Sequence, residues 1–201
     1  MGSDIVLASS SPRRRELLES VGVEFRVISP TADESRLNDE PPGEFALRVS
    51  AAKALSAARG LEPGTIVIGA DTIVVVDGDV LGKPSDEKEA SSMLLRISGG
   101  EHCVLTAFSL VRPDSEIIHS EIVETRVRVK SLAAWEIEGY IKTGEPMDKA
   151  GAYGIQGIGA FMIKDIRGSY TNVVGLPLVE LLEALRQQGK GNIFGEDGFN
   201  K

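Results

Sequence analysis

Apolar and polar positions follow two periods along the 201-residue chain, and their order predicts a mixed α/β or α+β fold with a partly antiparallel sheet. The strand-like runs are apolar or alternate with period two, and they lie at residues 4–8, 24–29, 65–84, 102–112 and 121–130. The run at 65–84 contains two such segments, joined by an Asp77-Gly78 hairpin signal.

Helices are expected where apolar residues recur every three or four positions, at residues 12–22, 43–60, 85–100, 131–144 and 177–188. Ser11 is a candidate N-cap, with Pro12 at the first helical position. Ser85 or Asp86 is expected to cap the third helix. We expect Trp135, on the fourth helix, to belong to the core. The Gly-rich segment 149–177 is expected to lead to the final helix.

Composition limits the functional classes. A chain with 42% hydrophobic and 26% charged residues can bury an ordinary core, in one domain or two small lobes. The formal net charge of -8 argues against binding of a nucleic-acid polymer, so any anion must be held by a local cluster. The single cysteine, Cys103, excludes an internal disulfide and a multi-cysteine zinc site, and we expect it to be a small buried hydrophobe.

No segment of the sequence resembles a targeting signal or a membrane span. Residues 1–11 lack the apolar core of a signal peptide, and no run approaches the ~20 apolar residues of a spanning helix. We therefore expect a soluble cytoplasmic protein without a membrane partner. The polar, Gly-rich end at 189–201 is expected to be a frayed tail without chemistry.

The first candidate for chemistry is the turn "SSSPRRR" at residues 9–15. Three arginines lie in the first turn of a predicted helix, where the helix dipole is already positive. The hydroxyl of Ser9 and the side chains of Arg13 and Arg14 are suited to binding a phosphate. The alternative is a solvated basic turn whose arginines pair with Glu16 or Glu19, and this stretch alone does not separate the two.

The second candidate is Asp71, a carboxylate in the apolar run "GADTIVVV". It is expected at the end or a kink of a buried strand, and its charge needs a cation or a metal as partner. The alternative is an aspartate that bonds local backbone at a bulge.

The motif "LGKP" and the segment "TADES" offer two further charged groups. Pro84 favours an extended Lys83, which makes it a fixed cation beside a phosphate, although the motif also fits an ordinary turn. Glu34 is a possible metal ligand, although Thr31 and Glu34 also match a capping box.

Two more polar positions have ordinary alternatives. Lys53 shares an apolar helix stripe, where snorkelling is the commoner reason for a lysine. The segment "MDKAGAYGIQG" places Lys149, Tyr153 and Gln156 among glycines, either as a hinge or as a loop whose Gln156 amide recognises a base edge. The histidines, His102 and His119, lack metal-ligand spacing.

Several cations, about two carboxylates and no Ser-His or Cys-His pair suit the hydrolysis of a phosphate anhydride assisted by a divalent metal. The stretches "LASSSPRRRELL", "GADTIVV", "LGKP", "MDKAGAYGIQG" and "GSYTNVVGLPL" resemble, in order, the motifs of the Maf family of nucleotide pyrophosphatases. The likeness extends from Asp4 to about Gln187.

The resemblance implies an elongated fold like that of inosine triphosphate pyrophosphatases, with two lobes around a central cleft in one domain at 1–188. It also implies a homodimer and a divalent cation, Mg or Mn. The implied reaction is hydrolysis of a nucleoside triphosphate between the α and β phosphates. The motifs "GADT" and "GIQG" resemble the subgroup that acts on dTTP and UTP.

Residue roles follow from the same resemblance. Asp71 would activate water, and Glu34 with Asp71 would hold the metal. Arg13, Thr72 and Gln156 would set base specificity. The phosphates would meet Ser9, Arg14, Lys53 and Lys83, with Arg15 outside the cleft. Two alternative functions stay open. One is a pyrophosphatase for modified pyrimidine triphosphates, and the other is a nucleotide-binding regulator of cell division.

Overall fold

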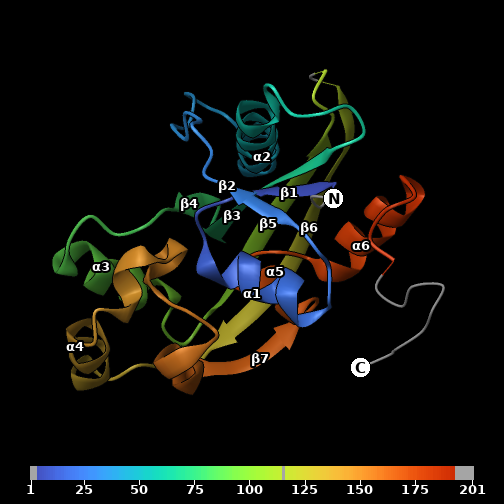
Figure 1. The fold of residues 1–201 in the computed structure, drawn as a ribbon. Coiled ribbons are helices and arrows are strands. Elements are labelled where there is room, and N and C mark those ends of the chain that lie inside the picture. Colours follow the sequence, from blue (N-terminus) through green and yellow to red (C-terminus); the bar gives the residue numbers. More distant parts are fainter. Residues whose placement is uncertain (1–3, 115, 193–201) are drawn as a thin grey trace.

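The computed structural model describes residues 4–114 and 116–192, which form a seven-stranded mixed sheet flanked by helices (Figure 1). The strand order is β2-β1-β3-β5-β6-β7, and β4 pairs with β3. Their bounds are β1 Ile5–Ala8, β2 Arg26–Ile28, β3 Ile66–Val76, β4 Asp79–Leu81, β5 Glu101–Val111, β6 Ile117–Val129 and β7 Ile163–Arg167.

The sheet is parallel at one end and antiparallel elsewhere. Strand β1 runs parallel to both β2 and β3, whereas β3, β5, β6 and β7 pair antiparallel in succession. The hairpin predicted at Asp77-Gly78 joins β3 to β4, and both of its turn residues have positive φ. The predicted mixed sheet is therefore confirmed, although β3 continues through Asp71, which lies mid-strand and not at a strand end.

Six α-helices and three short 3-10 helices connect the strands in the described part of the chain. The helices are α1 Pro12–Ser20, α2 Pro42–Ala58, α3 Glu87–Ile97, α4 Ala134–Lys142, α5 Tyr170–Val174 and α6 Leu178–Gln187, and the 3-10 helices are η1 Glu145–Asp148, η2 Ala150–Ala152 and η3 Gly157–Met162. The five predicted helices are present. The Gly-rich segment 149–177 contains η2, η3, β7 and α5, for which the sequence pattern made no prediction.

The helix starts differ in how local side chains support them. Asp86 caps α3 by accepting a hydrogen bond from the Glu89 N–H at 2.7 Å, as one of the two predicted alternatives. Helix α1 begins at Pro12 as predicted, but the Ser11 side chain makes no capping hydrogen bond. The prediction for Trp135 is wrong, because this side chain is 73% exposed while α4 buries Ile137 and Tyr140.

Alternation along the strands divides the core between the two faces of the sheet. On one face, Val6 and Ala8 of β1 pack with alanines of α2, whereas Ile5 and Leu7 pack with α1 and α6 on the other. Figure 1 shows α2 on the opposite side of the sheet from α1, α5 and α6. A further apolar cluster joins the C-terminal half of β3, at Val74 and Val76, to α3 and α4.

Two expectations concern the chain ends and membranes. Residues 189–192 follow α6 without regular structure, and the rest of the expected tail, 193–201, lies outside the described residues. Among the helices of the described part, none has the length and hydropathy to span a bilayer. The division into two lobes stays a prediction.

Candidate active site

The site lies at a gap along one edge of β3. Strand β1 pairs with this edge as far as Gly69, and β4 pairs with it again from Val74. Between these pairings, no described strand pairs with residues 70–73 on this edge. The turn at 9–11 follows β1 directly into the gap, so the carboxyl end of a parallel strand delivers it there, where ligands of α/β sheets commonly bind.

A cavity of about 360 Å³ opens at the gap. Its charged lining contains two more cationic than acidic side chains, although the whole chain carries a net charge of -8. This local reversal of sign suits an anionic ligand. The charged lining residues are Arg13, Arg14, Lys53, Lys83 and Lys149, with Glu34, Asp71 and Asp148.

A lysine between two carboxylates forms the charged centre of the cavity. The Lys53 Nζ lies 2.8 Å from Asp71 Oδ1 and 2.8 Å from Glu34 Oε2. Lys53 and Asp71 are buried, whereas the Glu34 side chain is 57% exposed. Burial of the Lys53 and Asp71 charges is thus compensated by their pairing. Snorkelling does not describe Lys53, because its ammonium is buried against carboxylates.

Gly69 explains how α2 brings Lys53 so close to β3. A Cβ at this position would lie 2.1 Å from the Ser50 carbonyl oxygen and 2.7 Å from the Ala54 backbone nitrogen. Only a residue without a side chain therefore permits this approach of helix to strand. The glycine before "ADT" thus allows the Lys53–Asp71 contact.

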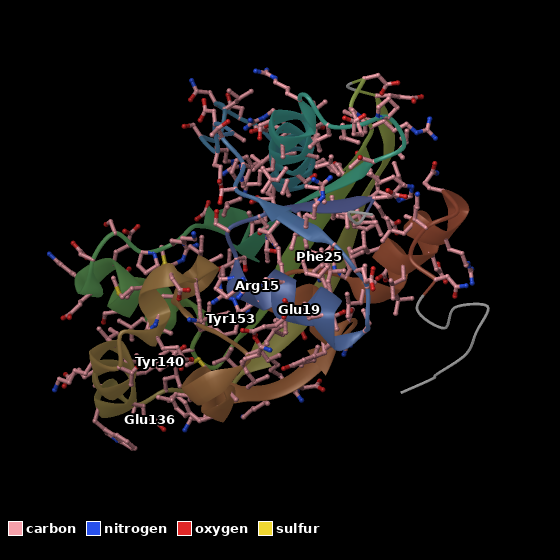
Figure 2. All side chains as sticks on the ribbon, in the orientation of Figure 1. Arg15, Glu19, Phe25, Glu136, Tyr140 and Tyr153 are labelled. Carbon is pink, nitrogen blue, oxygen red and sulfur yellow. The ribbon has the colours of Figure 1, made fainter. Side chains whose placement is uncertain are left out.

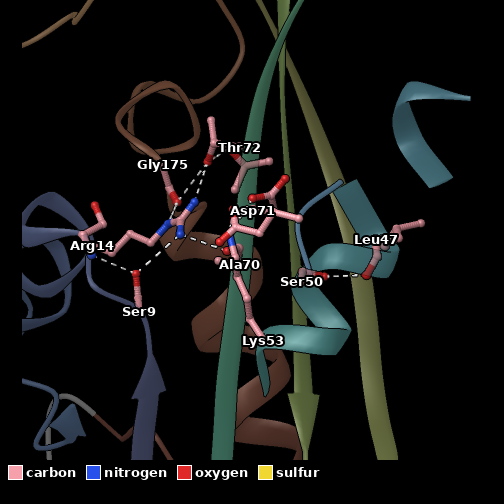
Figure 3. A network of polar contacts seen from close by, with 12 residues as sticks. Ser9, Arg14, Leu47, Ser50, Lys53, Ala70, Asp71, Thr72 and Gly175 are labelled. Carbon is pink, nitrogen blue, oxygen red and sulfur yellow. Dashed lines mark hydrogen bonds and ion pairs between the residues drawn. The ribbon is translucent and has the colours of Figure 1, made fainter. Parts of the chain in front are cut away.

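Arg14 binds the opposite side of β3 (Figure 3). Its Nε donates to the Gly175 carbonyl at 2.7 Å and one terminal nitrogen donates to the Ala70 carbonyl at 2.8 Å. The other terminal nitrogen donates to Thr72 Oγ1 at 3.0 Å. Burial lowers the pKa of Arg14, although an arginine keeps its charge in proteins. Most of its donors are thus already occupied by the protein's own oxygens.

The other two arginines of the turn point to different surroundings. Arg13 lines the cavity and pairs with Asp148 at 3.1 Å, which also accepts from Lys149 Nζ at 2.6 Å. Burial acts to raise the pKa of Asp148, but the hydrogen bonds from Lys149 and Arg13 outweigh it and the pKa is lowered. Arg15 is exposed, lies outside the cavity lining and pairs with Glu19 (Figure 2).

The structure brings most of the predicted site residues together. Ser9 is not part of the cavity lining, because its buried hydroxyl accepts hydrogen bonds from the Ser11 N–H and from Arg14. The exposed Lys83 reaches the cavity from the loop after β4, which a hydrogen bond from Gly151 N–H to the Gly82 carbonyl ties to η2. The predicted residues that line the cavity are Arg13, Arg14, Glu34, Lys53, Asp71, Thr72, Lys83 and Gln156.

Sequence reasoning missed Asp148 and Glu145 as members of the site region. Asp148 pairs with a residue 135 positions away, and Glu145 binds backbone groups of η3, so neither contact has a local signature. Cys103 was expected to be buried but is half-buried, and burial together with Glu124 raises the pKa of its thiol.

Glu34 and Asp71 fit the requirements of a hard divalent cation. Segment 29–41 forms no helix, so Glu34 does not serve the capping box that its spacing with Thr31 allowed. Within the described ranges, no group of three or more His, Cys, Asp or Glu residues is arranged for a metal. Two carboxylates at a cavity match the way Mg²⁺ is held, by one or two protein oxygens together with water and phosphate.

Comparison with known proteins decides the family. The model of the Maf family, described as Maf-like protein, matches residues 4–188. The chain belongs to the Maf family. A dTTP/UTP pyrophosphatase of Syntrophus aciditrophicus is 47% identical over 96% of this chain and 93% of its own. Another of that name, from Symbiobacterium thermophilum, is 53% identical over 92% of this chain and 94% of its own.

A solved structure confirms the expected fold. The Ham1 protein of Staphylococcus aureus superimposes with a TM-score of 0.50 at 16% identity, over 92% of this chain and 99% of that one. The Maf-family chain therefore shares the inosine triphosphate pyrophosphatase-like architecture that its motifs predicted.

Proposed function

We propose that this Maf-family protein hydrolyses dTTP and UTP between the α and β phosphates, giving the monophosphate and pyrophosphate. The observation that carries the proposal is the contact of Lys53 with both Asp71 and Glu34 in a cavity of net positive lining. The names of the relatives at 47% and 53% identity support the same substrates.

Asp71 is the residue we assign to water activation. It is the buried carboxylate of the cavity, and it is fixed by a strand on one side and by Lys53 on the other. A positioned carboxylate of this kind accepts the proton of the attacking water. Lys53 and Lys83 then neutralise charge on the phosphates, because both lysines line the cavity.

A divalent cation, Mg²⁺ or Mn²⁺, would be held by Glu34 and Asp71. When bound, it would stabilise negative charge on phosphate oxygens. The exposure of Glu34 leaves its carboxylate free to turn from Lys53 to such an ion.

Base recognition is assigned to Arg13, Thr72 and Gln156. All three line the cavity, and Thr72 is held in place by Arg14 and by Thr106 Oγ1 at 3.0 Å. Because the donors of Arg14 and the hydroxyl of Ser9 are used internally, we assign these two residues to shaping the turn rather than to contact with phosphate.

The test is to incubate the purified protein with a panel of canonical and modified pyrimidine triphosphates and to identify the products. We expect pyrophosphate and monophosphate from dTTP and UTP, with Mg²⁺ or Mn²⁺ required and a chelator abolishing turnover. Release of orthophosphate would contradict the α–β cleavage. Binding without turnover would favour a regulator of cell division, and preference for 5-methyl-UTP or pseudo-UTP would favour modified substrates.

Two further parts of the proposal rest on the family resemblance and the sequence. A homodimer is expected, and light scattering at several protein concentrations would test it. A cytoplasmic location is also expected, and fractionation of the source cells would test it.

A further inference from the structure

Gln156 begins the short helix η3 but does not cap it. It occupies the N-cap position, its side chain makes no capping hydrogen bond, and it lines the cavity. The first N–H groups of a helix need acceptors, which a side chain at the N-cap often supplies. A different residue must therefore satisfy η3 if the Gln156 amide is to face a ligand.

Glu145 supplies those acceptors from a distance. Its Oε2 accepts from the Ile158 N–H and its Oε1 from the Gly159 N–H, both at 2.9 Å. Burial acts to raise the pKa of Glu145, but these N–H groups and the Tyr140 hydroxyl outweigh it and lower the pKa. The carboxylate is thus a charged cap on a helix to which it does not belong.

Tyr140 extends this support to the other side of Gln156. Its hydroxyl donates to Glu145 Oε1 at 2.9 Å and accepts from the Gly154 N–H at 3.1 Å. Backbone on both sides of Gln156 is therefore tied to one Tyr140–Glu145 pair. Figure 2 shows Tyr140 on the same side of the molecule as Tyr153, which also lines the cavity.

The glycines around Gln156 leave the space that this arrangement needs. A Cβ at Gly157, where φ is +70°, would lie 2.8 Å from Glu145 Oε2. A Cβ at Gly159 would lie 2.3 Å from the Gly154 carbonyl and 2.6 Å from the Tyr140 hydroxyl. The glycines of "GIQGIG" therefore allow a closely packed support and do not form a flexible hinge.

We propose that Glu145, with Tyr140, is a positioning residue for substrate specificity, because it caps η3 in place of Gln156 and thereby leaves the Gln156 amide for the base of the nucleotide. The inference rests on the proposed function, in which Gln156 recognises the base. It adds that selectivity depends on a carboxylate that touches neither substrate nor metal.

The experiment compares kcat/KM for UTP and CTP, which differ at the exocyclic group of the base, in Glu145→Gln and Tyr140→Phe. In Glu145→Gln the side-chain amide has only one oxygen, so it cannot replace both carboxylate oxygens that accept from the two N–H groups. We expect the UTP/CTP ratio to fall about fivefold or more. A merely structural role would lower both substrates equally and leave the ratio unchanged.

Glu136→Gln is the matched control. Glu136 also accepts from a helix N-terminal N–H, that of Ala133 at 2.9 Å, but it does not line the cavity and supports α4 (Figure 2). This variant should change the melting temperature without changing the ratio. Tyr140→Phe keeps the Glu145 charge, so it covers the case in which Glu145→Gln does not fold.

Gln156→Ala separates this inference from the proposed function. We expect it to lower the ratio, and Glu145→Gln added to it should cause no further fall. A lowered ratio in Gln156→Ala with an unchanged ratio in both Glu145→Gln and Tyr140→Phe would overturn the inference alone. An unchanged ratio in Gln156→Ala would also overturn it, while continued pyrophosphate release would leave the proposed function standing.

Discussion

The two faces of β3 carry neighbouring polar residues in opposite surroundings. Asp71 faces α2, where Lys53 and the exposed Glu34 complete a cluster of alternating charges. Thr72 faces the other way, where the Arg14 guanidinium is enclosed by neutral oxygens. Period-two alternation separates the two side chains, although both reach the cavity at the gap in the strand edge.

The Asp71 face of β3 carries the groups that would take part in the reaction, whereas the Thr72 face carries groups that hold the site in place. The ion pair between Lys53 and the exposed Glu34 carboxylate can open when a metal binds the carboxylate or a phosphate binds the lysine. A buried guanidinium that donates to backbone carbonyls has no such freedom, because each broken bond would leave a buried acceptor unpaired. We therefore expect changes on the Asp71 face to act on turnover, and changes on the Thr72 face to act on stability and selectivity.

Asp71→Asn is the sharpest test of the charged face. It removes the proton acceptor but keeps a side-chain oxygen facing Lys53. Lys53 also keeps its ion pair with Glu34. We expect kcat for dTTP to fall by about 10²–10⁴-fold while the protein stays folded. Pyrophosphate release measures the effect, and Asp79→Asn, at an exposed ion pair outside the cavity, should retain activity. Full turnover by Asp71→Asn would remove the assigned role.

Gly69→Ala tests whether the charged face depends on close packing of α2. The new Cβ would meet backbone of Ser50 and Ala54, so α2 must shift and the 2.8 Å contact of Lys53 with Asp71 must lengthen. We expect a loss of about 1–3 kcal/mol, as for other overpacked sites, together with reduced kcat. Thermal melting and the same assay measure both effects.

Gly139→Ala is the control for that substitution. Gly139 lies within α4 with open space around its Cβ position. Alanine there should stabilise the protein by up to about 1 kcal/mol through helix propensity, without affecting turnover. Equal behaviour of the two variants would show that packing at Gly69 does not matter.

The Thr72 face has a titratable group in His102. Its Nε2 lies 2.7 Å from the hydroxyl of Tyr153, and burial lowers the pKa of His102 from 6.5 to about 4. As the pH falls, the unfolded chain therefore binds a proton at His102 before the folded protein does. The contribution of neutral His102 to stability is complete above pH 6.5 and is lost as the pH falls toward 4. The expected loss in unfolding free energy is about 3 kcal/mol.

Denaturant unfolding between pH 8 and pH 4 measures this dependence. In His102→Gln the histidine contribution is gone, so the stability of the variant should fall less steeply over this range. Identical slopes for His102→Gln and the unmodified protein would contradict the assignment.

Asp148→Asn is the smallest expected effect and concerns the Arg13–Asp148 ion pair at the cavity. Asp148 occupies Arg13 when no substrate is bound, so its carboxylate competes with a triphosphate for that cation. Exposed pairs of this kind contribute little, and we expect KM for dTTP to fall about twofold to fivefold. Steady-state kinetics measure the change, with Asp165→Asn as a control at an exposed ion pair outside the cavity. A raised KM would show that Asp148 assists binding.

Local patterns in the sequence determined much of this fold. Helix α3 carries its own cap and acidic first turn, and the β3–β4 hairpin carries its own Asp-Gly turn, so both were predictable from nearby residues. The motifs also placed Asp71, Lys53 and Gln156 in one site. These features depend on contacts between residues close in the chain or on a resemblance to the family, and neither requires the packing to be known.

Tertiary structure decided what the arginines and the supporting residues do. Local sequence pattern alone does not distinguish Arg13, Arg14 and Arg15 at an unfavourable helix end, and only the family resemblance assigned them different roles. Folding brings Asp148, the Gly175 carbonyl and Glu19 to them respectively, so one faces the cavity, one is buried and one faces solvent. The support of Gln156 by Glu145 was likewise invisible, because it joins backbone N–H groups to a carboxylate more than ten residues away. Such contacts have no period and no spacing, since only the folded chain determines which distant groups meet.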